Sequence, residues 1–226
     1  MDAACTRSWL AEVAGSLEQQ RDYLTQLDAA IGDADHGINM HRGFTAVMRR
    51  TDALEDAATP GQLLKAAGRT FVSTVGGAAG PLYGTAFLQA GEALGDGGSF
   101  GPRRLLEALH ASLEGVQRVG AASEGDKTMV DALAPALAGF ELELRTGGSL
   151  ETAVRAASQA AGEGARATVP MQARKGRASY LGPRSVGHQD PGATSTALMF
   201  AALERAVLAD RSQRFAAGGR PRGSRP

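Results

Sequence analysis

The chain has 226 residues, of which 43% are hydrophobic and 21% charged, and its formal net charge is zero. This length and composition are typical of a globular protein with one large core. The sequence has no apolar run of about 18 residues and no basic-then-apolar start, which argues against a membrane span and a secretory signal. We therefore expect a soluble, cytoplasmic protein. The single Cys5, which cannot form an internal disulfide, fits a reducing compartment.

The charges are unevenly distributed along the chain. Residues 211–226 hold five arginines and no acidic residue, which leaves 19 basic and 24 acidic residues, a net charge of −5, in the rest. This segment is rich in Gly, Pro, Ser and Arg and has little to bury. We therefore predict one domain over residues 1–210 and a disordered basic tail over 211–226. The mildly acidic body argues against a nucleic-acid-binding protein.

Helical signals recur along residues 1–210, whereas the alternation of a strand does not. The "TPGQ" at 59–62 provides an N-cap, a first-turn proline and a capping box. Thr128 and Asp131 indicate a second capping box, and Pro135 is expected to bend or loosen the helix that follows. The sequence predicts an all-α protein with about eight helices, at about 6–29, 38–55, 59–71, 82–94, 102–119, 128–144, 149–168 and 193–209.

Four Gly-containing loops interrupt this pattern, and each leads into a helix. They are "IGDADHGINM" at 31–40, "STVGGAAGPLYGT" at 73–85, "AASEGDKTM" at 121–129 and the segment 172–195. Free backbone N–H groups and the positive end of a helix dipole at such places suit a phosphate. Each loop taken alone is better explained as an ordinary turn between helices. Four of them in one helical domain predict a shared anion site.

The first of these loops contains clustered acids. Asp33 and Asp35 are one residue apart, and Asp28 precedes Asp33 by five residues. Like charges this close repel one another unless a cation neutralises them, and hard oxygen ligands favour Mg²⁺ over zinc. The alternative for Asp33 and Asp35 is a solvated turn or the cap of the next helix. A metal held by acids beside phosphate-binding loops indicates a site for a nucleoside diphosphate or triphosphate.

Two common nucleotide-binding patterns are absent: G-x-x-x-x-G-K-[ST], and G-x-G-x-x-G after a strand. The loop motifs instead resemble, in order, those of the nucleotide-binding L subunit of bacterial dihydroxyacetone kinase: "LDAAIGDADHGINMHRGF", "TVGGAAGPLYGT", "EGDKTMVDAL" and "MQARKGRASYLGPRSVGHQDPGATS". The resemblance extends to about residue 210. It implies a barrel of eight antiparallel helices with the nucleotide at one end. There, resident ADP is held through two Mg²⁺ ions by three aspartates, here Asp28, Asp33 and Asp35.

The resemblance also implies which residues contact the nucleotide. Arg177 is expected to stabilise charge on the transferring phosphoryl group, with Lys175 as a second cation; the alternative for both is a solvated basic loop. Ala79 stands where the family commonly has Ser, so its backbone N–H must serve. His36 is either a phosphate contact or a structural residue, and Met129 either a nucleotide contact or core. The predicted cofactor-binding residues are His36, Gly37, Ile38, Asn39, Gly77, Ala78, Ala79, Gly120, Met129, Arg177, Asp190, Pro191 and Gly192.

Three functions remain open at this point. The first is a kinase subunit that takes a phosphoryl group from a phosphohistidine carrier, the M subunit of the phosphotransferase system. It passes that group through bound ADP/ATP to dihydroxyacetone on a K subunit. The second is an ATP-dependent triose or tetrose kinase subunit with exchangeable ATP, and the third is a nucleotide-binding regulator. His36 in "GDADHG" resembles the carrier-dependent members and favours the first. We expect a homodimer or a heteromeric complex, without nucleic acid or membrane.

Overall fold

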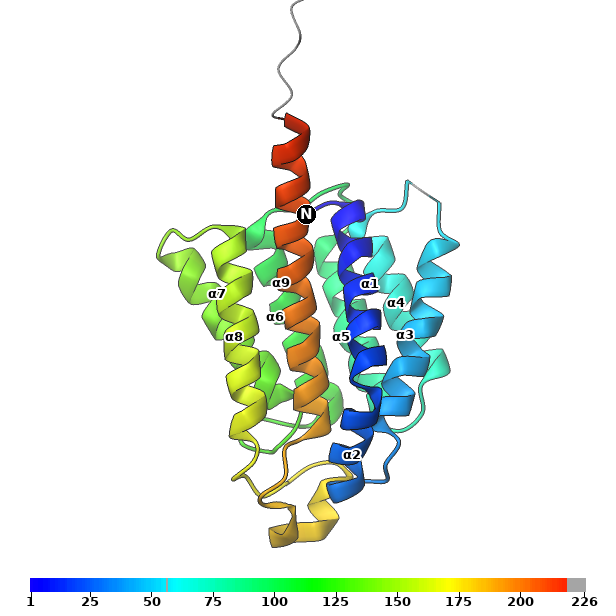
Figure 1. Ribbon diagram of the computed structural model, residues 1–226, viewed down its shortest axis with the longest axis vertical. Helices are drawn as coiled ribbons and strands as arrows, with labels where there is room; N and C mark the ends of the chain where they lie inside the picture. Colours follow the sequence, from blue (N-terminus) through cyan, green and yellow to red (C-terminus); the bar gives the residue numbers. More distant parts are fainter. Residues whose placement is uncertain (56, 219–226) are drawn as a thin grey trace, which may run out of the picture.

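The computed structural model describes residues 1–55 and 57–218 and is drawn in Figure 1. Apart from an isolated bridge between Asp2 and Ser99, the described residues form no strand, so the predicted all-α class is confirmed. None of the helices in these ranges is long and apolar enough to cross a membrane. The elements are α1 (Ala3–Gln19), α2 (Arg21–Ile31), α3 (His36–Asp52), α4 (Pro60–Thr74), α5 (Ala79–Leu94), α6 (Pro102–Gly120), α7 (Val130–Arg145), α8 (Leu150–Ala167), the 3₁₀ segment η1 (Arg177–Ser185) and α9 (Pro191–Gly218).

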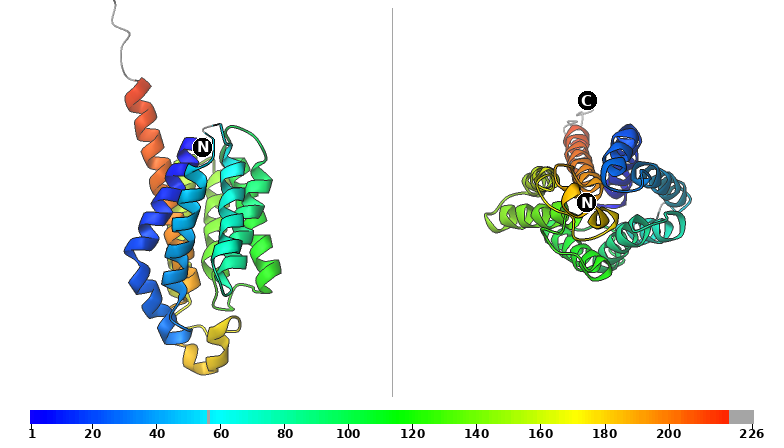
Figure 2. Two further views of the ribbon diagram at one scale, coloured as in Figure 1. Left: turned by 90° about the vertical axis from the view of Figure 1, so that its right-hand side faces the viewer. Right: turned by 90° about the horizontal axis from the view of Figure 1, so that it is seen from below.

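The helices form a closed ring, seen end-on in Figure 2. Successive helices from α3 to α9 pack side by side, and α1 closes the ring by packing against both α9 and α3. Neighbouring helices alternate in direction, as predicted. The loops before α3, α5, α7 and α9 therefore all lie at one end of the ring, together with α2 and η1 (Figure 1). We call this the loop end.

An aromatic cluster fills the middle of the ring. The ring centroids of Phe44 and Phe71 lie 5.1 Å apart in an edge arrangement, and those of Phe44 and Phe87 lie 5.9 Å apart. Trp9 packs on Phe87 at 6.1 Å and donates its indole N–H to the carbonyl oxygen of Met199. Burying each such side chain contributes about 1.5–3 kcal/mol. The ring is thus held together by its own core rather than by the loops.

The structure departs from the single helix predicted at 6–29. The backbone breaks at Gln20, with φ −99° and ψ 7°, so that α1 and α2 replace one helix. α1 packs along α9, whereas α2 continues past the ring and contacts η1. Gln20 is neither Gly nor Pro, and the break follows from the separate packing of the two segments.

The two predicted capping boxes differ in the structure. At Thr59 the box is complete, because the hydroxyl accepts from the Gln62 N–H and the Gln62 side chain accepts from the Thr59 N–H. At Thr128 only half of the box forms: Asp131 Oδ2 accepts from the Thr128 N–H at 2.8 Å. The Thr128 hydroxyl accepts instead from the Val130 N–H, and α7 begins at Val130.

Pro135 lies inside α7, which nevertheless continues to Arg145. Because proline has no N–H, the carbonyl oxygen of Asp131 loses its helical partner. That oxygen lies against Gly164 of α8, where a Cβ would come within 2.1 Å of it. The absence of a side chain at Gly164 therefore lets α7 and α8 approach closely at this point.

The predicted tail is partly helical. α9 continues to residue 218, so the prediction of disorder is wrong for residues 211–218, and residues 219–226 lie outside the described residues. Arg211 forms an ion pair with Glu151 of α8 at 3.2 Å, and Arg214 pairs with Asp2 at 2.6 Å. These arginines meet acids on neighbouring elements, which favours continuation of the helix where composition alone predicted a free tail.

Candidate nucleotide and metal site

A pocket of about 480 Å³ lies at the loop end of the ring. Its walls come from the loops before α3, α5, α7 and α9 and from η1, and its size is that of a small-molecule site. The structure therefore brings the four Gly-containing loops together, as the sequence predicted. The predicted residues that line the pocket are Asp28, Asp33, Asp35, His36, Asn39, Gly77, Ala78, Ala79, Gly120, Met129, Arg177, Asp190, Pro191 and Gly192.

Three acidic side chains gather on one wall. Asp28, Asp33 and Asp35 each offer a carboxylate oxygen, and these three atoms lie within 4.8 Å of one another. The buried Asp28 accepts hydrogen bonds from the backbone N–H groups of Asp35 (2.8 Å) and His36 (3.1 Å). Ala34 has a left-handed φ of 62°, which is uncommon for a residue with a Cβ, and turns the chain between the other two acids. The loop thus folds back onto α2 and concentrates oxygen ligands of the kind that Mg²⁺ prefers.

Two glycines make this tight loop possible. A Cβ on Gly32 would lie 2.0 Å from Asp28 Oδ1, and a Cβ on Gly37 would lie 2.0 Å from the Arg21 carbonyl oxygen. Gly37 is therefore packed beneath α2, and Ile38 is 52% exposed. Gly37 and Ile38 were predicted to contact the nucleotide, but neither residue lines the pocket. Helical geometry explains this, since residues three apart on α3 face the pocket while the two between them face elsewhere.

The first turns of α3 and α5 form the part of the pocket that suits phosphates. Neither N-cap residue, Asp35 or Ala78, caps its helix with a side-chain hydrogen bond. The first backbone N–H groups of α5 are therefore free of side-chain caps, whereas the His36 N–H at the start of α3 donates to Asp28 Oδ2; both helix dipoles add positive potential. Gly77, with a φ of 64°, turns the chain into α5. Two such helix ends in one pocket suit a polyphosphate better than a single charge.

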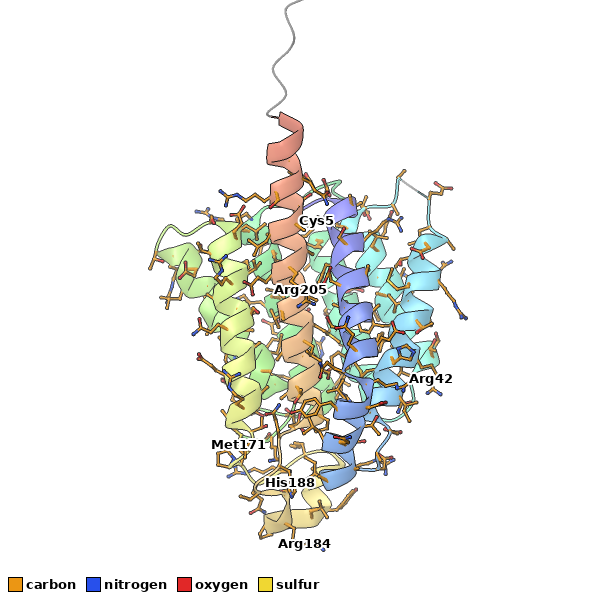
Figure 3. All side chains as sticks on the ribbon, viewed as in Figure 1. Cys5, Arg42, Met171, Arg184, His188 and Arg205 are labelled. Carbon is orange, nitrogen blue, oxygen red and sulfur yellow. The ribbon has the colours of Figure 1, made fainter. Side chains whose placement is uncertain are left out.

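The segment 168–190, which joins α8 to α9 and contains η1, forms a cap over the loop end (Figure 1). Figure 3 labels three residues of this cap, Met171, Arg184 and His188. The cap carries Lys175 and Arg177 to the pocket, where Arg177 Nη2 lies 3.0 Å from Asp33 Oδ2. The two side chains of this pair are 65% and 36% exposed, so the pair is weak and can exchange with bound ions.

A buried lysine holds the cap in place. Lys127 is 1% exposed and donates to the carbonyl oxygens of Thr168 (2.6 Å), Met171 (3.1 Å) and His188. Thr168 and Met171 lie at the start of the cap and His188 lies near its end, so the ammonium group of Lys127 joins the two ends. Sequence reasoning missed Lys127 as a pocket residue. Its signal was a charged residue within the "EGDKTM" motif, but a lysine in a loop is ordinarily solvated.

Asp190 caps the start of α9 from a buried position. Its carboxylate accepts from the Ala193 N–H at 2.7 Å, and its own N–H donates to the Thr168 hydroxyl at 2.9 Å. Burial raises the pKa of Asp190 to about 7, and the charge of Asp131 raises this pKa as well, while the bond from Ala193 and the Lys127 charge oppose the rise. Burial also lowers the pKa of Lys127. The pocket therefore contains an acid that titrates near neutral pH.

His36 is tied to α9 and α5 by hydroxyl groups. Its Nε2 lies 2.8 Å from Ser195 Oγ, which lies 2.7 Å from the Tyr83 hydroxyl. Tyr83 also donates to the Gly192 carbonyl oxygen at 2.9 Å. Burial lowers the pKa of His36, which favours a neutral ring at pH 7. Sequence reasoning did not single out Ser195 or Tyr83, because a hydroxyl inside a helix gives no signal of its distant partner.

The wall away from the acids is apolar. Val116 and Val119 of α6, Leu82 of α5 and Met129 before α7 line it, close to Gly120 at the end of α6. Such a surface suits a flat apolar group, for example a nucleobase. Met129 is 5% exposed and also belongs to the main core, so the structure gives it the core role that the sequence left open and places it in the pocket wall.

Comparison with known proteins fits this architecture. Residues 30–205 match the family model described as the DAK2 domain. The chain belongs to the DAK2 domain family. It is 44% identical over 200 residues to the ADP-binding subunit DhaL of the PEP-dependent dihydroxyacetone kinase of Escherichia coli K12, covering 88% of this chain and 95% of the relative. It is 37% identical over 202 residues to the ADP-binding subunit DhaL of the PTS-dependent enzyme of Lactococcus lactis, with coverage of 89% and 96%.

A solved structure supports the fold. The dihydroxyacetone kinase of C. freundii, in complex with AMP-PNP and Mg²⁺, aligns with a TM-score of 0.69 and 26% identity over 91% of this chain. The alignment covers 34% of that kinase, so this chain spans about a third of its length. Asp33, Asp35 and the cap fall within the DAK2 match, and Asp28 lies two residues before it.

Proposed function

We propose that this chain is the ADP-binding subunit of a phosphoenolpyruvate-dependent dihydroxyacetone kinase. In this role it takes a phosphoryl group from a phosphohistidine carrier, the M subunit, and passes it to dihydroxyacetone held on a K subunit. The observation that carries the proposal is one pocket that joins three carboxylates to the N-termini of two helices, α3 and α5. The names of the E. coli and L. lactis relatives support the same reading. A cytoplasmic location and a resident nucleotide are part of it.

Asp28, Asp33 and Asp35 would hold Mg²⁺, as two ions in this proposal. Their oxygens are hard ligands within 4.8 Å of one another, and no cysteine of the described residues lines the pocket, which fits magnesium rather than a softer metal. Bound Mg²⁺ supplies positive charge that neutralises the polyphosphate and the group in transfer.

The remaining pocket residues bind and orient the nucleotide and shield it from water. The first turn of α5 offers free N–H groups to the phosphates, the dipole of α3 adds positive potential, and the apolar wall at Met129 and Gly120 receives the base. Arg177 lies beside the acids, so its guanidinium reaches a phosphoryl group bound there and stabilises its charge. Lys127 holds the cap that brings Arg177 to this position, and Ser195 fixes the ring of His36.

The test is an exchange experiment. The protein is loaded with labelled ADP and Mg²⁺, and unlabelled ADP is added in excess during turnover with phosphorylated carrier, K subunit and dihydroxyacetone. We expect the label to stay bound over many turnovers, because two helix ends, the metal and the cap enclose the nucleotide. Exchange within one turnover would contradict the proposal. So would phosphorylation driven by free ATP at the carrier-driven rate, which would favour the ATP-dependent alternative.

A further inference from the structure

A groove runs along the outer face of α3, outside the nucleotide pocket. It consists of two adjoining hollows of about 650 Å³ and 620 Å³ that share His41 and Arg42. The first hollow continues along α3 to Arg49 and Arg50 and is bordered by Thr74 of α4. The second hollow reaches α2 at Arg21. Figure 3 labels Arg42 on the flank of the ring.

The groove is strongly basic. Arg42, Arg49 and Arg50 are exposed, and no carboxylate of the described residues lies within ion-pair distance of them. The acidic residue in its lining is Asp22, which already pairs with Arg21 at 2.9 Å. This concentration of positive charge contrasts with the net charge of −5 that residues 1–210 carry as a whole. Arg49 and Arg50 also complement the dipole at the end of α3, but this explanation does not extend to Arg42 near its start.

The groove begins beside the pocket. α3 starts with His36 in the pocket wall, and the exposed Ile38 lies two residues further, at the entrance of the groove. From Ile38 to Arg49 the helix advances about 16 Å. A protein lying along α3 would therefore contact this stretch of helix while one end of it stays next to the pocket. An exposed apolar residue followed by arginines is a composition found at protein interfaces.

We propose that this basic groove docks an acidic face of the protein that donates the phosphoryl group. The inference rests on the proposed function. A phosphoryl group carries about two negative charges near neutral pH, so a loaded donor is more strongly attracted to the groove than the same donor after transfer. Dihydroxyacetone is neutral, and the charge of the groove gives no such preference on the acceptor side. The groove thus favours binding of the phosphorylated donor and release of the dephosphorylated donor.

The experiment reverses charge in the groove without altering the pocket. The double variant Arg49→Glu/Arg50→Glu is compared with Arg103→Glu/Arg104→Glu, a pair of exposed arginines at the start of α6 that lie outside the groove. A third variant, Ala46→Glu, adds one acid to the groove and keeps both arginines. The readouts are kcat/KM for the phosphorylated carrier at low and high salt, and ADP affinity by calorimetry.

We expect the groove variant to lower kcat/KM for the carrier at least about tenfold at low salt, and the difference to shrink to about threefold or less in 0.5 M salt. Ala46→Glu should show a smaller loss with the same salt dependence. ADP affinity should stay unchanged in all variants. Equal kcat/KM in the groove and α6 variants would overturn the inference while leaving the proposed function intact. Failure of the unmodified protein to accept a phosphoryl group from the carrier would instead overturn the proposed function.

Discussion

The two ends of the helical ring use charge in opposite ways. At the loop end, Asp28, Lys127 and Asp190 are buried and bonded to backbone groups. At the opposite end, the ion pairs of Arg211 with Glu151 and Arg214 with Asp2 join exposed arginines to their partners. Buried charges are costly unless every partner is present, whereas exposed pairs contribute little. Substitutions at the loop end should therefore have large and specific effects, and those at the opposite end small ones.

The largest effect concerns Asp190. Its pKa is about 7 in the folded protein against 3.8 for an unperturbed group, so its folded form favours the proton. The protonated Asp190 carboxyl group therefore makes its full contribution to stability below about pH 4, and this contribution is lost as the pH rises through 7. This corresponds to about 4 kcal/mol in the free energy of unfolding. Urea unfolding from pH 4 to pH 7 should show this loss, and Asp190→Asn should remove it. Parallel pH curves for the two proteins would contradict the expectation.

The next effect concerns Lys127. Lys127→Met leaves three buried carbonyl oxygens without their donor and should lower the free energy of unfolding by about 3 kcal/mol. Hydrogen exchange should increase in the cap, residues 168–190, more than in the ring. The matched control is Lys65→Met, whose partly exposed side chain pairs with Asp96 at 3.6 Å and should matter little. Unchanged exchange in the cap would show that Lys127 does not hold it.

A smaller effect, confined to binding, is expected at Asp33. Its side chain is 36% exposed, so Asp33→Asn should leave the fold intact. Loss of a proposed metal ligand should weaken ADP binding in Mg²⁺ at least about a hundredfold, or about 2.7 kcal/mol. Asp22→Asn, on the exposed face of α2, is the control. If calorimetry gives equal ADP binding in EDTA and in Mg²⁺, the metal site is wrongly assigned.

The smallest effect is expected at the opposite end. Deleting residues 211–226 removes the exposed ion pairs to Glu151 and Asp2 and should lower the thermal midpoint by at most a few degrees. ADP affinity should not change, because the deleted helix lies at the far end of the ring (Figure 1). A large loss of nucleotide binding would show that the two ends are energetically coupled.

The sequence predicted what local patterns encode. Helix periodicity and the cap at Thr59 gave the ring helices, and the clustered acids with the Gly-containing loops gave the pocket. The break at Gln20 was missed because it depends on how α1 and α2 pack elsewhere. Ser195 and Lys127 were missed because their partners lie far away in the chain. Pairing of the arginines after residue 210 was missed for the same reason.

Closure of the ring between α1 and α9 also affects how the chain can be rearranged. The pair formed by Arg214 and Asp2 brings the start of the chain beside the outer part of α9, at the end away from the pocket. A linker joining these two points, with new termini opened in the 95–101 loop at the same end, should give a circularly permuted protein with its pocket intact. The same placement allows another domain to be fused before Asp2 or directly after α9 without covering the site.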